Sequence, residues 1–285
     1  MNYRHAFHAG NFADVFKHTI LIGLLQALKE KPAPFCYLDS HAGAGRYDLR
    51  GVEAAKTGEA QDGIVRLLGA QAAAPPSLRA YLDLIAALNL AGYSGHAIAI
   101  YPGSPLIASH LLRPSDRAVL CELQDEEAAA LKALFAGNAR IGVHRRDGYA
   151  ALAGLLPPKE RRGLLLIDPP FEAQEGEFRA IEATLKSAYA RWPTGIYAIW
   201  YPIKQREATR PFLRWFAASG MRKTLVAELL LRADDSPLRL NGCGMVIVNA
   251  PWKFDDQLRE LLPVLLEDLS RESARSTRVD WLVRD

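Results

Sequence analysis

The chain has 285 residues, of which 49 % are hydrophobic and 24 % are charged, and its net charge is +3. This composition is typical of a folded globular protein and excludes a disordered or fibrous chain. The length fits one large α/β domain, or such a domain with an insertion. The weak positive charge allows a nucleic-acid partner but does not require one.

The amino terminus and the cysteines exclude further classes. The start MNYRHAFHAGN is polar and charged, so we expect no signal peptide, and no apolar run approaches the roughly 18 residues of a membrane span. The cysteines Cys36, Cys121 and Cys243 are scattered and lack a CxxC spacing, which predicts neither a disulfide framework nor a zinc site. We therefore expect a cytoplasmic protein that has no metal and no membrane contact.

The first predicted element is a helix over residues 11–31. Asn11 is a suitable N-cap, and proline at positions 32 and 34 ends the helix. Apolar residues repeat every four positions, at Phe12, Phe16, Ile20, Leu24 and Leu28. The residues from Tyr3 to His18 are also unusually rich in polar side chains, and the spacing of Asp14, Lys17 and His18 predicts that they share one face of the helix.

Apolar segments that alternate with helical stretches predict a mostly parallel sheet. The segment FCYLD forms the first strand, and the other candidates are residues 118–123, 140–144, 163–167, 195–201, 224–231 and 244–249. Helical patterns lie between most of them, for example over 125–135 and 177–190. Because the strands are continuously apolar, helices should cover both faces of this seven-stranded, Rossmann-like α/β sheet.

Residues 46–96 interrupt this alternation, since they are rich in Ala and Leu and contain no convincing strand. We predict a helical subdomain over 46–96, inserted into a domain formed by residues 1–45 and 97–285. It could face the substrate as a lid, or it could consist of helices that only add packing.

A glycine-rich turn follows the first strand, in Asp39-Ser40-His41-Ala42-Gly43-Ala44-Gly45. Ligands of open α/β sheets bind at the carboxyl ends of the strands, where Gly43 and Gly45 let the backbone approach a ligand closely. The turn is neither the dinucleotide fingerprint nor a phosphate loop, because Asp48 replaces the third glycine and GxxxxGK[ST] is absent. The remaining interpretations are a site for S-adenosylmethionine and a purely structural turn.

Acidic residues follow the next two strands. Glu122 ends the strand AVLCEL, where it could accept hydrogen bonds from two ribose hydroxyls. Asp147 could accept from the adenine amine of a cofactor, and Gly148 would leave room for the ring. Each signal alone is also compatible with a solvated strand end or a turn.

The strongest motif is GLLLIDPPF, in which an apolar strand enters Asp168-Pro169-Pro170-Phe171. The two prolines fix a rigid extended exit from the strand. The Asp168 carboxylate and the Pro169 carbonyl could accept the two N–H groups of an exocyclic amine and stabilise the positive charge that develops on nitrogen. Phe171 could stack on a flipped-out base. The tetrad indicates amine methylation but not which amine, because DNA adenine, RNA adenine, cytosine N4 and glutamine amide enzymes use related tetrads. An initial Asp resembles the adenine enzymes, whereas glutamine enzymes typically begin with Asn.

Four motifs together closely resemble the ribosomal large subunit methyltransferase J family: YRHxFHAGNxADVxKH, YLDxHAGAGRY, YPGSPLIA and LIDPPFE. The similarity covers nearly the whole chain and includes RRG, YAIWYPI and VNAPWK. It implies a class I methyltransferase fold, S-adenosylmethionine as cofactor and N6 of one adenine in 23S rRNA as target. We also expect a monomer. It also implies cofactor contacts at His18, His41, Ser104, Glu122, Asp147 and Gly148, with Asp168 as the catalytic acceptor. The chain departs from the family in one respect, because Phe171 stands where many relatives carry Tyr.

Three amino-terminal residues, Tyr3, His5 and Lys17, form part of the adenine-facing wall in our hypothesis. Phosphate contacts could come from a basic rim that comprises Arg46, Arg50, Arg145, Arg146, Lys159, Arg161 and Arg162. The alternatives are a DNA adenine methyltransferase, a glutamine methyltransferase and a non-catalytic RNA-binding protein. The absence of an obvious DNA-reading module disfavours the first, Asp168 disfavours the second, and the intact glycine turn and tetrad disfavour the third.

Overall fold

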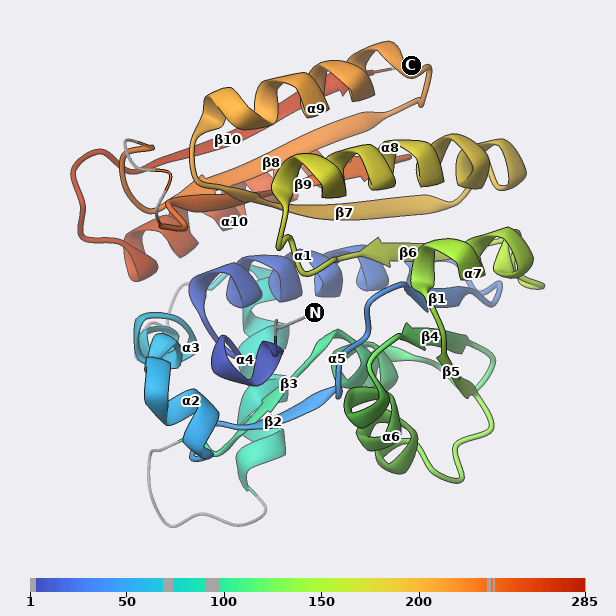
Figure 1. Ribbon diagram of the computed structural model, residues 1–285, viewed down its shortest axis with the longest axis horizontal. Helices are drawn as coiled ribbons and strands as arrows, with labels where there is room; N and C mark the ends of the chain where they lie inside the picture. Colours follow the sequence, from blue (N-terminus) through green and yellow to red (C-terminus); the bar gives the residue numbers. More distant parts are fainter. Residues whose placement is uncertain (1–3, 69–73, 91–97, 235–236, 238, 285) are drawn as a thin grey trace.

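The computed structural model describes residues 4–68, 74–90, 98–234, 237 and 239–284. A sheet of eight strands runs through the molecule in the order β10-β8-β9-β7-β6-β1-β4-β5 (Figure 1). Its strands are β1 (Cys36–Asp39), β4 (Arg117–Glu122), β5 (Ile141–Arg145), β6 (Gly163–Ile167), β7 (Ile196–Ile203), β8 (Thr224–Leu230), β9 (Gly242–Val248) and β10 (Ser276–Val283). A separate antiparallel pair joins β2 (Arg46–Asp48) to β3 (Ile100–Pro102).

The sheet is mostly parallel. Strands β5, β4, β1, β6 and β7 pair in parallel, whereas β9 is antiparallel to both β7 and β8. Each of the seven predicted strands is present, with ends within two residues of the prediction. The eighth strand, β10, was not predicted. It pairs antiparallel with β8 at the sheet edge. Its mostly half-buried residues alternate between apolar and charged, so it lacks the continuously apolar run that marked the other strands.

Helices cover both faces of the sheet because its central strands are buried on both sides (Figure 1). Along β6, Leu164 and Leu166 belong to one hydrophobic cluster, whereas Leu165 and Ile167 belong to the other. The first cluster includes residues of α1 (Phe12–Lys29), α4 (Pro76–Leu90), α5 (Ser104–Leu111), α6 (Asp125–Leu134) and α10 (Phe254–Leu269). The second includes residues of α7 (Gly148–Leu155), α8 (Gln174–Arg191) and α9 (Arg206–Ala218).

Helix α1 begins as predicted, because the Asn11 side chain caps it by accepting a hydrogen bond from the Asp14 amide at 2.9 Å. The helix packs against the sheet as well as against α4, α5 and α10, so it is buried on nearly all sides. Its polar side chains Asp14, Lys17 and His18 are therefore buried too. A buried charge is tolerated only where it is paired, so we expect Asp14 and Lys17 to have partners of opposite charge.

The segment between β1 and β3 contains β2, α2 (Val52–Thr57), the 3₁₀ helix η2 (Glu59–Asp62), α3 (Ile64–Leu67) and α4. The expectation that residues 46–96 contain no strand is wrong, because β2 occupies 46–48. The sequence of β2, RYD, buries only Tyr47, so this strand is too short and too polar to be recognised from sequence. Residues 69–73 and 91–96 of the predicted subdomain lie outside the described residues. Its existence as a separate subdomain stays a prediction.

In the described part of the chain, every helix is too short or too polar to cross a membrane.

Candidate active site

The glycine turn lies at the carboxyl end of β1 and has a backbone that only glycine adopts easily. Gly43 has φ +62° and Gly45 has φ +76°. A Cβ on Gly43 would lie 2.3 Å from the Tyr47 hydroxyl, and one on Gly45 would lie 2.8 Å from a methyl group of Leu131. The turn is therefore compact and leaves no space for larger residues.

Glu122 lies beside this turn because β4 pairs with β1 in parallel, so that both strands end at the same edge. Its Oε2 accepts a hydrogen bond from the Gly43 amide at 2.8 Å, and its Oε1 accepts one from the Gln124 amide at 2.7 Å. These two bonds fix the buried carboxylate at the mouth of the turn. The structure thus brings two of the predicted cofactor residues together, while their contact with a ribose stays a prediction.

Asp147 and Gly148 join the same edge at the start of α7. Asp147 caps this helix, because its Oδ1 accepts hydrogen bonds from the amides of Tyr149 at 2.8 Å and Ala150 at 3.2 Å. A Cβ on Gly148 would lie 1.9 Å from the carbonyl oxygen of Ser40. From the sequence we expected Gly148 to leave room for the ring of a cofactor. The structure shows that α7 also contacts the glycine turn at this position, where a side chain would not fit.

A buried carboxyl, Asp39, ends β1 and was not among the predicted contacts. Its Oδ2 accepts hydrogen bonds from the hydroxyls of Tyr37 at 2.6 Å and Ser104 at 2.7 Å. Burial raises the pKa of Asp39 to about 6, although both hydrogen bonds oppose the shift. Ser104, a predicted cofactor contact, therefore lies at this edge with its hydroxyl directed at Asp39. An acid that directly precedes a glycine turn was the signal for this residue.

Two predicted histidines are held in the neutral form. Burial lowers the pKa of His41 to about 4. The Nδ1 atom of His41 lies 2.8 Å from Ser40 Oγ. Burial also lowers the pKa of His18 well below its usual range, and its Nδ1 lies 2.8 Å from the Tyr101 hydroxyl. Whether these histidines contact a cofactor stays a prediction.

The predicted catalytic residue Asp168 follows β6 and forms an ion pair with Lys17. The Lys17 ammonium lies 2.5 Å from Asp168 Oδ2 and 2.9 Å from Asp14 Oδ1. The exposed fractions of these side chains are 7 % for Lys17, 2 % for Asp14 and 17 % for Asp168. His5 Nε2 lies 2.9 Å from Asp14 Oδ2, on the other side of this group. Of the three residues predicted to share one face of the helix, Lys17 contacts both Asp14 and Asp168, whereas His18 contacts Tyr101.

The electrostatics of this group follow from its burial and its pairing. Burial alone would lower the pKa of the Lys17 ammonium, but the carboxylates of Asp14 and Asp168 overcome this effect and raise it well above its usual range. Burial alone would raise the pKa of Asp14, but His5 and Lys17 hold it well below its usual range. Lys17 is therefore a permanent cation between two carboxylates at neutral pH.

The remaining part of the DPPF motif forms a tight aromatic exit. The Phe171 amide donates to the Pro169 carbonyl at 3.0 Å. The half-buried Phe171 ring meets Phe178 and Trp200 edge to face, with ring centroids 5.6 Å away in each case. Trp200 was missed as a member of this cluster because it comes from a different strand, β7, which pairs with β6.

The remaining predicted residues have fewer contacts with this site, or lie away from it. Tyr3 lies outside the described residues. The ring of His5 packs against Tyr47 with centroids 4.9 Å apart. The shared basic rim is wrong for Lys159, Arg161 and Arg162, because they precede β6 whereas Asp168 follows it. Arg162 instead donates to the carbonyls of Leu28 and Ala33.

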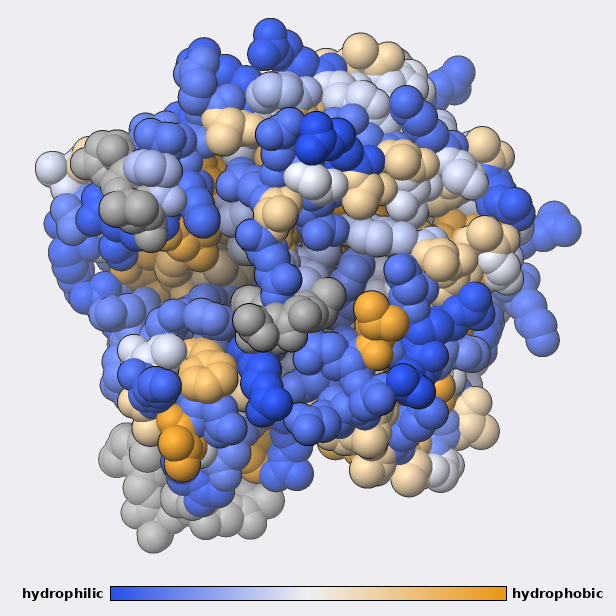
Figure 2. Space-filling model, viewed as in Figure 1, coloured by the Kyte–Doolittle hydropathy of each residue, from blue (hydrophilic) through white to orange (hydrophobic). Residues whose placement is uncertain are grey.

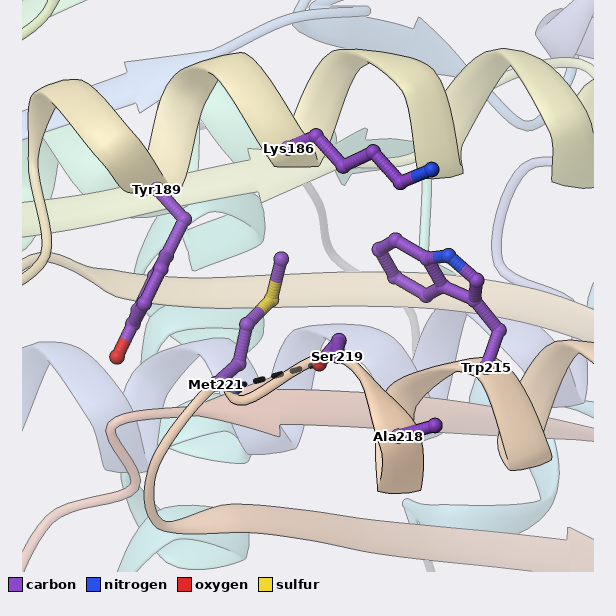
Figure 3. Close-up of a pocket in the computed structure, with 6 residues that line it drawn as sticks. All are labelled: Lys186, Tyr189, Trp215, Ala218, Ser219 and Met221. Atoms are coloured by element: carbon purple, nitrogen blue, oxygen red, sulfur yellow. Dashed lines mark hydrogen bonds between the residues drawn. The ribbon is translucent and has the colours of Figure 1, made fainter.

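A cavity of about 400 Å³ lies away from this site, between the carboxyl-terminal parts of α8 and α9. In Figure 3 the rings of Tyr189 and Trp215 lie on opposite sides of Met221, with the Lys186 amine near Trp215. These residues precede β7 and β8 and so lie near the amino ends of those strands. Figure 2 shows a second hollow at the left of the view, where hydrophobic side chains are visible on an otherwise mostly hydrophilic face.

Comparison with known proteins identifies the family. A family model described as "Ribosomal RNA large subunit methyltransferase D, RlmJ" matches residues 32–283. The chain belongs to this RlmJ family. Two relatives are both named Ribosomal RNA large subunit methyltransferase J. The one from Haemophilus influenzae is 41 % identical and the one from Escherichia coli 40 % identical, and each alignment covers 99 % of both chains.

A solved structure has a similar fold over nearly the whole chain. The crystal structure of a Legionella pneumophila protein is 35 % identical and has a TM-score of 0.86, with 96 % of this chain and 98 % of that chain covered. The family resemblance and the Rossmann-like class I methyltransferase fold expected from the sequence are therefore confirmed.

The contact between Gly148 and Ser40 predicts a stability difference within one helix of this RlmJ family member. Gly148→Ala should lower the free energy of unfolding by about 1–3 kcal/mol, because the new methyl group must displace backbone. Gly154→Ala, in the same helix, is the control, since a Cβ there meets no atom within 4 Å. Denaturant unfolding of both variants would measure the difference, and equal stabilities would refute the packing role.

The neutral state of His41 predicts a pH dependence. An unfolded chain protonates this imidazole below about pH 6.5, whereas the folded chain does so only near pH 4. Stability should therefore fall as the pH decreases through this window, with His41 contributing on the order of 1–3 kcal/mol. Denaturant unfolding at several pH values should show that the free energy of unfolding changes less with pH in His41→Asn than in the original chain. Identical slopes would show that His41 is not held neutral.

Proposed function

We propose that the protein methylates the exocyclic N6 amine of an adenine in 23S rRNA and uses S-adenosylmethionine as the methyl donor. The observation that carries this proposal is the position of Asp168, a partly buried carboxylate that Lys17 holds at the sheet edge beside the glycine turn. The RlmJ family and the names of the two relatives support rRNA as the substrate class. We propose further that the protein acts in the cytoplasm as a monomer, without a metal.

The residues at the carboxyl edge fit this cofactor. The Glu122 carboxylate at the mouth of the turn can accept from ribose hydroxyls, and Asp147 can accept from an adenine amine through Oδ2, since both of its capping bonds use Oδ1. Acidic groups beside the neutral His41 and His18 suit a molecule with a cationic sulfonium and an amine. Gly43, Gly148 and Ser104 would complete its contacts. When bound, S-adenosylmethionine supplies the electrophilic methyl group.

Asp168 would orient the target amine. Lys17 binds Oδ2 and so fixes the rotation of the carboxylate, which presents Oδ1 to one amine hydrogen. The Pro169 carbonyl, which already accepts from Phe171, has a second lone pair for the other hydrogen. Two acceptors on the amine direct its lone pair away from the ring, and the carboxylate stabilises the positive charge that develops on N6. The protein forms no covalent bond to its substrate in this scheme.

The aromatic group beside the acid would hold the base. Phe171 already meets Phe178 and Trp200 edge to face, so its ring is fixed before a base arrives. Stacking of a base on such a ring is worth about 1–3 kcal/mol. This stabilisation offsets the free energy needed to extrude an adenine from an RNA loop. His5 and Lys17, with Tyr3 in our hypothesis, would form part of the adenine-facing wall.

Substitution of Asp168 tests the catalytic role. Asp168→Ala should reduce methyl transfer to protein-free 23S rRNA at least about 100-fold, because the amine loses its charged acceptor. Its affinity for S-adenosylhomocysteine should stay within about tenfold. Glu175→Ala is a matched control, since this exposed acid pairs with Arg179 at 2.9 Å in α8. Turnover of Asp168→Ala comparable to that of the control would contradict the assigned role.

The substrate class is tested with labelled S-adenosylmethionine and three acceptors in parallel. Protein-free 23S rRNA, the assembled large subunit and duplex DNA should be incubated with the protein, and their nucleosides then analysed. We expect labelled N6-methyladenine from rRNA and none from duplex DNA, because an RNA loop releases a base more easily than a duplex does. Label in DNA alone, or label in no acceptor, would overturn the proposed function.

A further inference from the structure

The amino-terminal arm, defined as residues 4–11, is fastened to the segment from α2 to α3. The Ile64 amide donates to the Gly10 carbonyl at 2.9 Å, and the Thr57 hydroxyl donates to the Phe7 carbonyl. A Cβ on Gly63 would lie 2.0 Å from the Gly10 carbonyl oxygen, so the two backbones are in direct contact. Figure 1 shows the dark blue helix η1 (His5–Phe7) of the arm near α2, which it contacts.

Glu59, in η2, forms two further bonds across this contact. Its Oε1 lies 2.9 Å from His8 Nδ1, and its Oε2 accepts from Asn11 Nδ2 at 2.9 Å. The hydrogen bond with Glu59 outweighs burial and raises the pKa of His8, which favours a charged partner for the carboxylate. Glu59 therefore binds both the arm and the residue that caps α1.

The bond to Glu59 reinforces the direction in which the Asn11 amide faces. An amide has one acceptor oxygen and one donor nitrogen, so a carboxylate at the nitrogen directs the oxygen to the opposite side. The Asn11 oxygen accordingly accepts from the Asp14 amide at 2.9 Å. The Asp14 N–H also selects the oxygen, so without Glu59 the Asn11 side chain would keep one of the two bonds that hold its amide in place.

From Asp14 the contacts continue to Asp168, the proposed acceptor for the target amine. Asp14 Oδ2 accepts from the Gly10 amide at 3.0 Å, and Asp14 Oδ1 lies 2.9 Å from the Lys17 ammonium. Lys17 in turn binds Asp168 at 2.5 Å. A continuous series of polar contacts thus joins Glu59 to Asp168 through Asn11, Asp14 and Lys17.

We propose that Glu59 is a positioning residue for methyl transfer, because it fixes Asn11 and, through Asp14 and Lys17, the orientation of the Asp168 carboxylate. This inference rests on the proposed function and assigns a catalytic purpose to the α2–α3 segment. Glu59 touches neither Asp168 nor the glycine turn in the contacts described above. Its effect should therefore appear in the rate of transfer and not in cofactor affinity.

Glu59→Ala should lower kcat for 23S rRNA methylation about tenfold, which corresponds to roughly 1.4 kcal/mol of transition-state stabilisation. The Kd of S-adenosylhomocysteine and the midpoint of thermal unfolding should match those of the control Asp62→Ala. Asp62 is an acid of the same short helix, but its side chain is 84 % exposed and pairs with Arg66 at 3.9 Å. Asp62→Ala should retain the original kcat.

Two further variants separate positioning from a general loss of structure. Glu59→Gln should recover part of the rate, because its amide oxygen can still accept from Asn11 Nδ2. The double variant Glu59→Ala/Asn11→Ala should be no slower than Asn11→Ala, because Glu59 acts through Asn11. This comparison remains decisive if Glu59→Ala also lowers the unfolding midpoint.

The outcomes are distinct. A Glu59→Ala variant with unchanged kcat, or a double variant in which the two losses multiply, would overturn the inference while the original chain still methylates rRNA. If the original chain transfers no methyl group to rRNA, the proposed function fails first. A tenfold loss of kcat with unchanged cofactor affinity, together with the non-additive double variant, would support the inference.

Discussion

The arrangement depends on one buried cation, the Lys17 ammonium, between the carboxylates of Asp14 and Asp168. A lysine buried in a helix that packs on all sides would normally lose its charge or destabilise the fold. Here two carboxylates compensate for the water that the ammonium has lost, and removal of Lys17 would leave both of them without their shared cation. The same pairing ties the first helix to the strand that ends at Asp168. Structure and proposed catalysis therefore require the same contact.

The sheet explains why residues so distant in sequence meet. Parallel strands β1, β4, β5 and β6 end at one edge, which places Asp39, Glu122, the Asp147 cap and Asp168 along a single row. Tight contacts at the glycine turn keep this row in register, since Gly43 packs against the Tyr47 hydroxyl and Gly148 against the Ser40 backbone. A cofactor site at this edge follows from the topology, whereas the chemistry follows from which side chain ends each strand.

The sequence predicted those features that depend on local pattern. Each central strand was recognisable from its apolar run, and the acids Glu122 and Asp147 were assigned to one cofactor from their places after the strands. The Asn11 cap and the common face of Asp14 and Lys17 followed from helical spacing. Strands β2 and β10 were missed because they lack an apolar run. The contacts of Glu59 with Asn11 and of Trp200 with Phe171 were missed because each joins two elements that are distant in sequence, and a periodic pattern describes only one element. Long-range pairing of this kind emerges only from packing.

The most direct test of the account is a double-mutant cycle on the single-turnover rate of methyl transfer, with Lys17→Met, Asp168→Asn and the combined variant. If Lys17 acts by orienting Asp168, the combined variant should be no slower than Asp168→Asn alone, because the lysine then has no carboxylate to hold. If the two losses multiply, Lys17 acts independently of Asp168, and the account of a lysine-oriented acceptor is wrong.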